Sequence, residues 1–544
     1  MTGATTLDVP DLTPDGSGDA RAPSLRRRIR RDCQAWIGRH LISLVIVLPL
    51  LAVVGAVHGI GMAAFPRFVD DPGTYLSQAW SLQYEHRLSP YSYFYDHAPA
   101  GWIQIAAWSA LTNGFNRYDS AIAFGNECML IAKVVSSALL FVLGRRLGFG
   151  RVAATGAALL FGLCPLALVY GRWTFLDNLV TPWLLLAFVL AYSPRRSIAA
   201  AVGATLAFGM AALTKETALV VLPAFAWALL QNLDRRNRAH LLVTSAFAGI
   251  LLMALYPLMA LFKGELLPGP GHNSLVGTAV WQLADRAASG SVLDPHSATA
   301  DQLHGWLQYD RWLLLLGLAA IPVALLVRRL RPVALVLVIQ WLVMVRGGYV
   351  PFMHVINLLP WSALLVAGAV STVAGTQALV PTGWLRARAS SGAAHGVRIG
   401  VAGLLALGLV GVATASWAPR LRQMTTVSQE QPLRSATTWL ADNVARNKVV
   451  VVHDSIWTDL VHRYGFNPRP VMIYKLDSDP AVRDNLARID YLVLPDWYYG
   501  TSEAPQKYPT LTEARKHAVE VASFGAGPDR VRIYRVSDHW RPSK

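Results

Sequence analysis

The chain has 544 residues, of which 53% are hydrophobic and 15% are charged, and its mean hydropathy is +0.36. A soluble globular protein of this length needs more charged side chains to cover its surface, so the composition excludes that class and predicts a polytopic membrane protein. The formal net charge of +16 comes largely from short arginine clusters between apolar segments. This is the positive-inside pattern, so we expect contact with membrane lipids and no nucleic-acid partner.

The chain begins with a polar and basic region, residues 1–40, which we expect to lie in the cytoplasm. Residues 1–24 are rich in Asp, Pro, Gly, Ser and Thr, and such a composition favours disorder. The arginine-rich run 26–31 then precedes the apolar stretch 41–66, which is long enough to cross a bilayer of roughly 30 Å. Because the basic run should stay inside, the first span is expected to lead outwards.

Further apolar segments bring the expected number of membrane-spanning helices to about eleven. They are residues 120–144, 152–170, 178–193, 197–213, 217–232, 241–262, 312–327, 332–345, 352–372 and 399–417. The arginine clusters occupy alternate connections, all on the side of the N-terminal run. We therefore expect an all-α transmembrane domain over residues 41–417 in the cytoplasmic (plasma) membrane, with the N-terminus inside.

Two long connections and the C-terminal part are expected on the external face. The connection 67–119 contains a short apolar stretch, 99–112, typical of a helix lying in the membrane interface, and the connection 263–311 is expected to be irregular. Residues 418–544 are polar and predict a small external α/β domain. Its strand-like runs are 448–453, 471–474, 491–494 and 530–536, and its amphipathic stretches include 432–446 and 481–488.

Ionisable residues gather at the expected external ends of the helices. They are Asp70, Asp71, Asp96, His97, Arg172, Asp177, Lys215, Glu216, Arg346 and His354. Such a mixture of carboxylates and cations suits a reaction that needs a base for an acceptor hydroxyl and cations for an anionic leaving group. The contiguous His453-Asp454-Ser455 is not expected to form a catalytic group, since adjacent residues rarely face one another.

Several motifs, in this order, resemble those of the polyprenyl-phosphate-sugar-dependent glycosyltransferases of the GT-C superfamily, in the branch of protein O-mannosyltransferases and aminoarabinose transferases (glycosyltransferase family 39-like). The motifs are Asp71-Pro72-Gly73-Thr74-Tyr75, Tyr95-Asp96-His97-Ala98-Pro99, Tyr170-Gly171-Arg172 with Leu176-Asp177-Asn178, and Leu213-Thr214-Lys215-Glu216. A softer motif, Gly347-Gly348-Tyr349-Val350-Pro351, follows. The resemblance covers roughly residues 40–370.

The resemblance implies an inverting transfer of a sugar from a polyprenyl phosphate to an acceptor hydroxyl, with Asp71 as the general base. Pro72 stands where the family usually has a glutamate, which leaves Asp70 as a substitute carboxylate, and Asp96 matches a second acidic position. The residues implied at the donor phosphate are Arg172, Lys215, Arg346 and His97. The implied supporting residues are Asp177, which would orient Arg172, together with Glu216, Tyr75 and Tyr349.

Other functions stay open at this point. A transporter or flippase of lipid-linked sugars would place its charges near the membrane midplane and would show inverted repeats. A catalytically inactive relative that binds envelope glycans is the third reading. The acceptor is a glycan, a lipid or a protein, and no cofactor is certain, although Asp70, Asp71 and Asp96 offer oxygen ligands to a divalent cation.

Overall fold

The computed structural model describes residues 25–375, 392–479, 482, 486–500 and 508–537. The chain divides into two compact units at Leu48, and the long helix α1, Leu25–Gly59, crosses that division. The disorder expected for residues 1–24 lies outside the described residues. All functional features below belong to the larger unit, residues 49–544.

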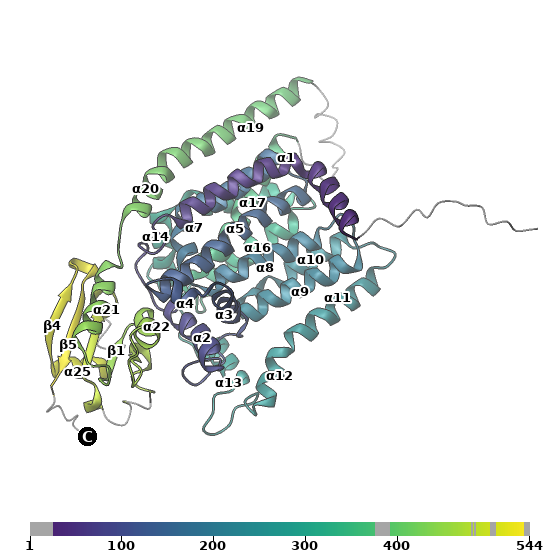
Figure 1. Cartoon of the computed structure of the whole chain (residues 1–544). Helices are drawn as coiled ribbons and strands as arrows, with labels where there is room; N and C mark the ends of the chain where they lie inside the picture. Colours follow the sequence, from purple (N-terminus) through teal and green to yellow (C-terminus); the bar gives the residue numbers. More distant parts are fainter. Residues whose placement is uncertain (1–24, 376–391, 480–481, 483–485, 501–507, 538–544) are drawn as a thin grey trace, which may run out of the picture. The chain divides into compact units, whose positions relative to one another are not determined.

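Helices make up most of the larger unit (Figure 1). Its first helices are α2 (Pro72–Glu85), α3 (Ala100–Thr112), α4 (Gly114–Arg117), α5 (Ala121–Leu147), α6 (Arg151–Leu163), α7 (Pro165–Arg172), α8 (Leu176–Ala191) and α9 (Ile198–Thr214). The next are η1 (Glu216–Val221), α10 (Leu222–Asn232), α11 (Arg238–Met253), α12 (Leu255–Phe262), α13 (Leu275–Val280), η2 (Trp281–Asp285) and α14 (Ala298–Tyr309). Then follow α15 (Trp312–Leu325), α16 (Arg331–Val345), η3 (Phe352–His354), α17 (Val355–Val373), α19 (Gly392–Val412), η4 (Ala413–Trp417) and α20 (Ala418–Thr426).

Five described stretches are long and apolar enough to cross a membrane, or six if the bent pair α6–α7 is one broken span. The five are His40–Gly59, Ala121–Leu147, Arg238–Phe262, Phe352–Val373 and Gly396–Asn443. The helices α8, α9, α15 and α16 are apolar but shorter. The chain is a multi-pass membrane protein, and about eleven spans stay a prediction, although each expected segment contains helix.

Local sequence explains where several of these helices begin and end. The Ser120 side chain accepts a hydrogen bond from the Ile122 backbone N–H and starts α5, and Gly148, in the left-handed conformation, ends it. The expected span 152–170 is divided because Pro165 cannot continue the hydrogen bonding of α6 and instead opens α7, which is bent by 56° from α6. The connection 263–311 is more regular than expected, since it contains α13, η2 and α14.

The C-terminal part contains the expected α/β fold. Its elements are α21 (Gln431–Asn443), β1 (Val450–Val452), α22 (Asp454–His462), β2 (Val471–Met472), η5 (Ile473–Lys475), η6 (Leu486–Arg488), β3 (Tyr491–Pro495), α23 (Asp496–Tyr499), α25 (Pro509–Lys516), β4 (Ala518–Phe524), η7 (Gly527–Asp529) and β5 (Val531–Val536). The sheet order is β2-β1-β3-β5-β4. The strand β1 runs parallel to β2 and β3, while β5 runs antiparallel to β3 and β4.

Two expectations for this part need comment. The strand β4 was not predicted, because its sequence Ala-Val-Glu-Val-Ala-Ser-Phe does not alternate regularly between apolar and polar residues. Half of the expected helix 481–488 lies outside the described residues, and its described end is the short η6. The buried core of the sheet includes Val451, Val471 and Leu492.

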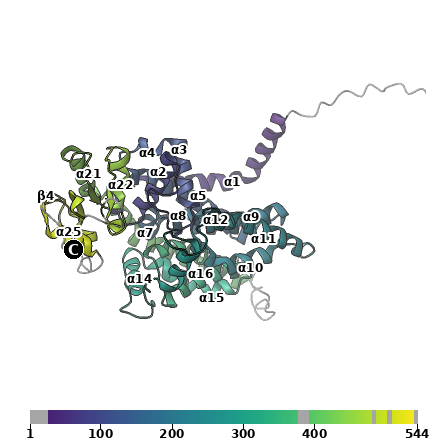
Figure 2. The same ribbon diagram turned by 90° about the horizontal axis from the view of Figure 1, so that it is seen from below.

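The C-terminal part packs against the first connection of the membrane part. Helix α22 contacts α2, and Figures 1 and 2 both show the two helices side by side. At the centre of this contact, a Cβ atom added to Gly73 would lie 2.2 Å from the carbonyl carbon of Asp454. Only glycine therefore permits the backbones to approach so closely. This contact places residues 453–475 beside residues 70–97.

Candidate functional site

The Asp70-Asp71 pair forms the turn before α2, and the two carboxylates face different groups. Asp71 has a φ of 82°, a conformation that is costly for any residue with a side chain. The Asp71 side chain lines a cavity, whereas Asp70 Oδ1 lies 3.2 Å from Nε2 of His453. The strained backbone thus separates two adjacent acids into different surroundings.

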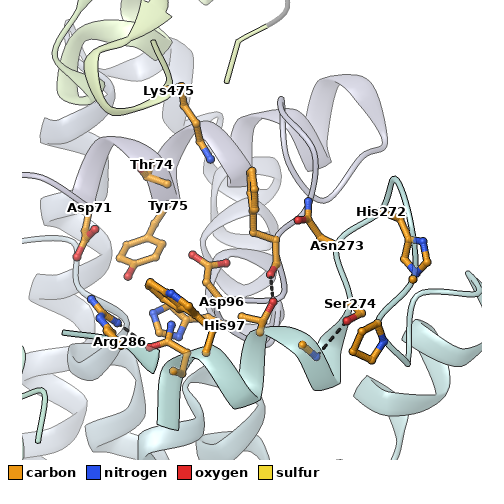
Figure 3. Close-up of a pocket in the computed structure, with 17 residues that line it drawn as sticks. Asp71, Thr74, Tyr75, Asp96, His97, His272, Asn273, Ser274, Arg286 and Lys475 are labelled. Atoms are coloured by element: carbon orange, nitrogen blue, oxygen red, sulfur yellow. Dashed lines mark hydrogen bonds between the residues drawn. The ribbon is translucent and has the colours of Figure 1, made fainter. Parts of the chain in front are cut away.

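The cavity beside this turn has a volume of about 650 Å³. Its described lining residues are Asp71, Thr74, Tyr75, Phe94, Asp96, His97, Pro268, Gly269, His272, Asn273, Ser274, Gly277, Thr278, Trp281, Gln282, Arg286 and Lys475. In Figure 3 the side chains of Asp71, Tyr75 and Asp96 lie between Lys475 on one side and Arg286 on the other. Carboxylates and cations therefore face a common space.

Asp71 has the electrostatic character of a base. Burial, and next the neighbouring Asp70, raise its pKa to about 6, against the opposing influence of Lys215 and His97. A carboxylate with a raised pKa binds a proton more strongly yet is still mostly ionised at neutral pH. This combination is what deprotonation of a hydroxyl requires.

The predicted residues His97 and Glu216 form a pair next to Asp96. Nδ1 of His97 lies 3.0 Å from Oε2 of Glu216, and the Glu216 carboxylate also accepts a hydrogen bond from the backbone N–H of Ala98. Burial lowers the pKa of His97, but the Glu216 carboxylate outweighs it, so the pKa lies above its usual value. Glu216 thus fixes the loop that carries Asp96 and favours a charged His97.

Lys215 and Asp177 form a buried ion pair, which corrects one predicted contact. Nζ of Lys215 donates to Oδ2 of Asp177 at 2.6 Å, and the Asn357 side-chain amide donates to the other oxygen at 3.0 Å. Asp177 therefore orients Lys215 rather than Arg172. Lys215 still contributes to the field at Asp71, although it does not line the cavity.

Arg172 lies apart from the cavity and is enclosed by the backbone. Only 1% of the residue is exposed, and its guanidinium donates to the carbonyl oxygens of Val57, His58, Phe65 and Met424 at 3.0 to 3.2 Å. These hydrogen bonds to carbonyl oxygens stabilise the buried positive charge of the guanidinium. The placement favours a role in holding the chain between α1 and α2, and it does not bring Arg172 to the expected phosphate.

Arg346 is exposed and does not line the cavity, whereas Arg286 does line it. The Arg286 guanidinium carbon lies 3.4 Å from the ring centroid of Tyr349, which is a close cation–π contact. The predicted Tyr349 thus supports an arginine that the sequence motifs did not indicate. The signal for Arg286 was weak, because it is a lone arginine in a connection expected to be irregular.

Lys475 is the other cation that sequence reasoning missed. It comes from η5 of the C-terminal part, and its Nζ lies 3.7 Å from the ring centroid of Phe94. Burial lowers the pKa of Lys475 to about 8, while Asp96 and Asp479 favour its charged form. No motif of the membrane part could reveal this residue, because it lies outside the region that the resemblance covers.

His453, Asp454 and Ser455 face one another and the Asp70 side chain, contrary to expectation. Nδ1 of His453 lies 3.1 Å from Oδ1 of Asp454 and 2.7 Å from Oγ of Ser455. The contiguous residues can meet because His453 is the N-cap of α22 and its side chain folds back over the first turn. The ligand atoms of Asp70, His453 and Asp454 lie within 4.8 Å of one another, close enough for a shared metal ion. Since both nitrogens of the imidazole already face carboxylates, we interpret the cluster as an ion-pair network.

Comparisons with known proteins agree with this geometry. Residues 96–259 match the family of dolichyl-phosphate-mannose-protein mannosyltransferases. The structure of ArnT from Cupriavidus metallidurans in the apo state is similar, with a TM-score of 0.54 and 13% identity over 90% of this chain and 98% of that chain. ArnT bound to undecaprenyl phosphate gives a TM-score of 0.52 and 14% identity over 92% of this chain and 98% of that one.

A third similar structure is the archaeal oligosaccharyltransferase AglB from Archaeoglobus fulgidus, in complex with an inhibitory peptide and a dolichol-phosphate. Its TM-score is 0.51 and its identity 13%, over 93% of this chain and 75% of that one. No curated protein sequence matches the chain. The helical membrane part and the small C-terminal sheet define a membrane protein with the fold of the GT-C glycosyltransferases. The matched family and the shared fold agree with the resemblance that the motifs predict.

Proposed function

We propose that the protein is a membrane glycosyltransferase that moves a sugar from a polyprenyl-phosphate-sugar to an acceptor hydroxyl. The observation that carries the proposal is that two acids, Asp71 and Asp96, line the same cavity as two cations, Arg286 and Lys475. Acids and cations facing one space suit a reaction in which a hydroxyl loses a proton while a phosphate gains charge.

Asp71 acts as the general base in this proposal. It takes the proton of the acceptor hydroxyl as the hydroxyl oxygen attacks the anomeric carbon of the sugar. The bond between that carbon and the phosphate oxygen breaks, and the polyprenyl phosphate leaves with the electron pair. Attack from the side opposite the leaving group inverts the anomeric centre. Asp96, in the same cavity, accepts hydrogen bonds from the sugar or the acceptor.

The leaving phosphate is stabilised by Arg286 and Lys475 rather than by Arg172 and Arg346. The Arg286 guanidinium packs over the ring of Tyr349, so it is oriented before the substrate binds. Lys475 supplies the second charge, and its weakened hydration in the partly buried setting strengthens its attraction for a phosphate. Lys215 and the charged His97 add to the positive field behind Asp71 and Asp96.

A lipid-linked donor fits the setting of this cavity. The donor has a prenyl tail that needs lipid and a sugar that needs water, so the site must lie at the membrane surface. Two of the similar structures are of ArnT bound to undecaprenyl phosphate and of AglB in complex with a dolichol-phosphate. We place the cavity and residues 418–544 on the external face of the cytoplasmic membrane, with the N-terminus inside, because the arginine clusters favour that orientation.

The test is sugar transfer by the purified full-length protein in liposomes. Radiolabelled polyprenyl-phosphate-sugars, one sugar at a time, are offered with envelope glycans, lipids and peptides as acceptors. The expected result is a labelled product with the inverted anomeric configuration, which the Asp71→Asn protein fails to make. Donor that crosses the liposome bilayer without transfer would instead show a flippase, and tight glycan binding with no turnover would show an inactive binding protein.

A further inference from the structure

A buried histidine links the C-terminal part to the turn that carries the candidate base. His453 is 1% exposed and Asp454 is 2% exposed. The imidazole stands between two carboxylates, with Asp454 Oδ1 at 3.1 Å from Nδ1 and Asp70 Oδ1 at 3.2 Å from Nε2. The aromatic rings of Tyr498 and Trp497 approach the same imidazole, at centroid distances of 5.2 and 6.5 Å. This histidine has no part in the mechanism above.

A second set of contacts fixes the other side of the turn. Oδ2 of Asp454 accepts hydrogen bonds from the backbone N–H and the hydroxyl of Thr74, at 2.9 and 3.0 Å. Between these anchors lies Asp71, with its positive φ. A strained conformation persists only where the surroundings determine it, and here the anchors on both sides belong to His453 and Asp454.

We propose that His453 is a positioning residue, which acts through Asp70 to hold the 70–74 turn so that the Asp71 carboxylate faces the cavity. The inference rests on the proposed function, since it concerns the base of that reaction. It assigns the C-terminal part a place in the active centre itself. Removing the imidazole frees Asp70, and the Asp71 side chain then spends less time in the orientation that reaches the acceptor hydroxyl.

Electrostatics supports the same assignment. Burial lowers the pKa of His453, but Asp454 and Asp70 outweigh it, so the pKa lies above the usual value and the charged form is favoured. A positive imidazolium balances Asp70, whose negative charge is the main Coulombic cause of the raised pKa of Asp71. Lys215, His97 and Asp96 also act on Asp71, and so does Asp454, which interacts electrostatically with Asp71 and contacts His453 directly.

The test compares His453→Gln with a matched control, His462→Gln. His462 lies on the same helix and contacts the same connection, through Asn116 at 3.0 Å, but not Asp70. In the full-length protein in liposomes, His453→Gln should lower kcat by about tenfold to a hundredfold, the usual result of a misplaced catalytic group. The donor KM should hardly change, and the acidic limb of the kcat profile should move to higher pH. His462→Gln should keep the wild-type values.

Two further measurements keep the inference testable if His453→Gln folds poorly or if the wild type transfers no sugar. Asp70→Asn should show the same fall in kcat, and the double variant should be no worse than either single variant, because both remove one link. Independently of activity, hydrogen exchange in peptides covering residues 70–76 should be faster in His453→Gln and Asp70→Asn than in His462→Gln.

The outcomes separate this inference from the proposed function. Unchanged hydrogen exchange, unchanged kcat, or fully additive losses in the double variant would overturn the positioning role. Activity that is lost with a chelator and restored by Mn²⁺, with weaker metal affinity in His453→Gln, would also overturn it in favour of metal ligation. Faster exchange in an enzyme without transferase activity would leave the link standing and remove the proposed function.

Discussion

The membrane part and the C-terminal part contribute to the cavity in different ways. The membrane part supplies the acids, Asp71 and Asp96, and the arginine stacked on Tyr349. The C-terminal part supplies Lys475 at the rim and the His453-Asp454 pair behind the turn. Of the first set, the motifs predict the two acids but not the arginine, whereas the second set follows from a contact between two backbones. Reactive groups and the groups that hold them thus come from different parts of the chain.

Of all the substitutions considered, we expect one at the candidate base, Asp71, to lower the rate of sugar transfer most. Asp71→Asn keeps the size of the side chain but removes its basicity, so we expect kcat to fall by about a hundredfold to ten-thousandfold. The measurement is the initial rate of sugar transfer in liposomes. Asp119→Asn is the matched control, because Asp119 lies in the same connection with a side chain that is 97% exposed. Equal rates for wild type and Asp71→Asn would contradict the assignment of the base.

A substitution at Gly73 tests the contact between the membrane part and the C-terminal part. The new Cβ of Gly73→Ala would overlap the backbone of Asp454 and Ser455, so the turn and α22 must separate. We expect a loss of about 1–3 kcal/mol in the free energy of unfolding and a fall in transfer rate that approaches that of His453→Gln. Thermal unfolding in detergent and transfer assays measure the two effects.

The control for Gly73 is Gly156→Ala, because a Cβ at Gly156 meets no atom within 4 Å. That variant should keep both stability and rate. Wild-type behaviour of Gly73→Ala would mean that the C-terminal part does not need this close approach. It would then contradict the view that the C-terminal part holds the turn that carries Asp71.

A finer test asks which positively charged residues bind the donor phosphate. Lys475→Gln and Arg286→Gln should each raise the donor KM roughly tenfold, the loss of about one charge-assisted contact. Arg346→Gln should have a much smaller effect, since Arg346 does not line the cavity. Lys516→Gln serves as the control in the C-terminal part, where Lys516 is exposed and pairs with Glu513. The reverse ranking, with Arg346 dominant, would restore the assignment made from the sequence motifs.

The smallest expected effects are those of pH on the wild type. Asp71 must be ionised to accept a proton, so kcat should fall as the pH drops through about 6, its raised pKa. Lys475 is charged below its pKa of about 8, so the donor KM should rise as the pH increases through that value. Lys475→Arg keeps the charge at high pH and should remove the alkaline rise. A KM that rises equally in wild type and Lys475→Arg would exclude Lys475 as its cause.

Much of the fold was predictable because apolar segments and arginine clusters are local signals. Each expected apolar segment contains a helix, and all four expected strands form, two of them over most of their length and two over half of it. The broken helix at Pro165 and the strand β4 were missed. Hydropathy ignores backbone hydrogen bonds, and β4 lacks a regular alternation of apolar and polar residues. The number of spans stays a prediction.

The site was predictable only where its residues lie in motifs. Asp71, Tyr75, Asp96 and His97 do meet at one cavity, with Glu216 behind them. Sequence order could not reveal that Asp177 pairs with Lys215, or that Arg172 is enclosed by carbonyl oxygens. Such partners depend on how helices pack, and a charged residue at a helix end has several neighbours within reach. The roles of all these residues stay proposals.

The glycine at position 73 has one more consequence, for the order of events during synthesis. Its close contact is with residues some 380 positions later, so the cavity lacks Lys475 and the His453 link until residues 453–475 have been synthesised. A nascent chain therefore exposes its acids without the groups that hold and balance them. If the proposed function is right, a chain that stops before residue 453 should therefore transfer no sugar.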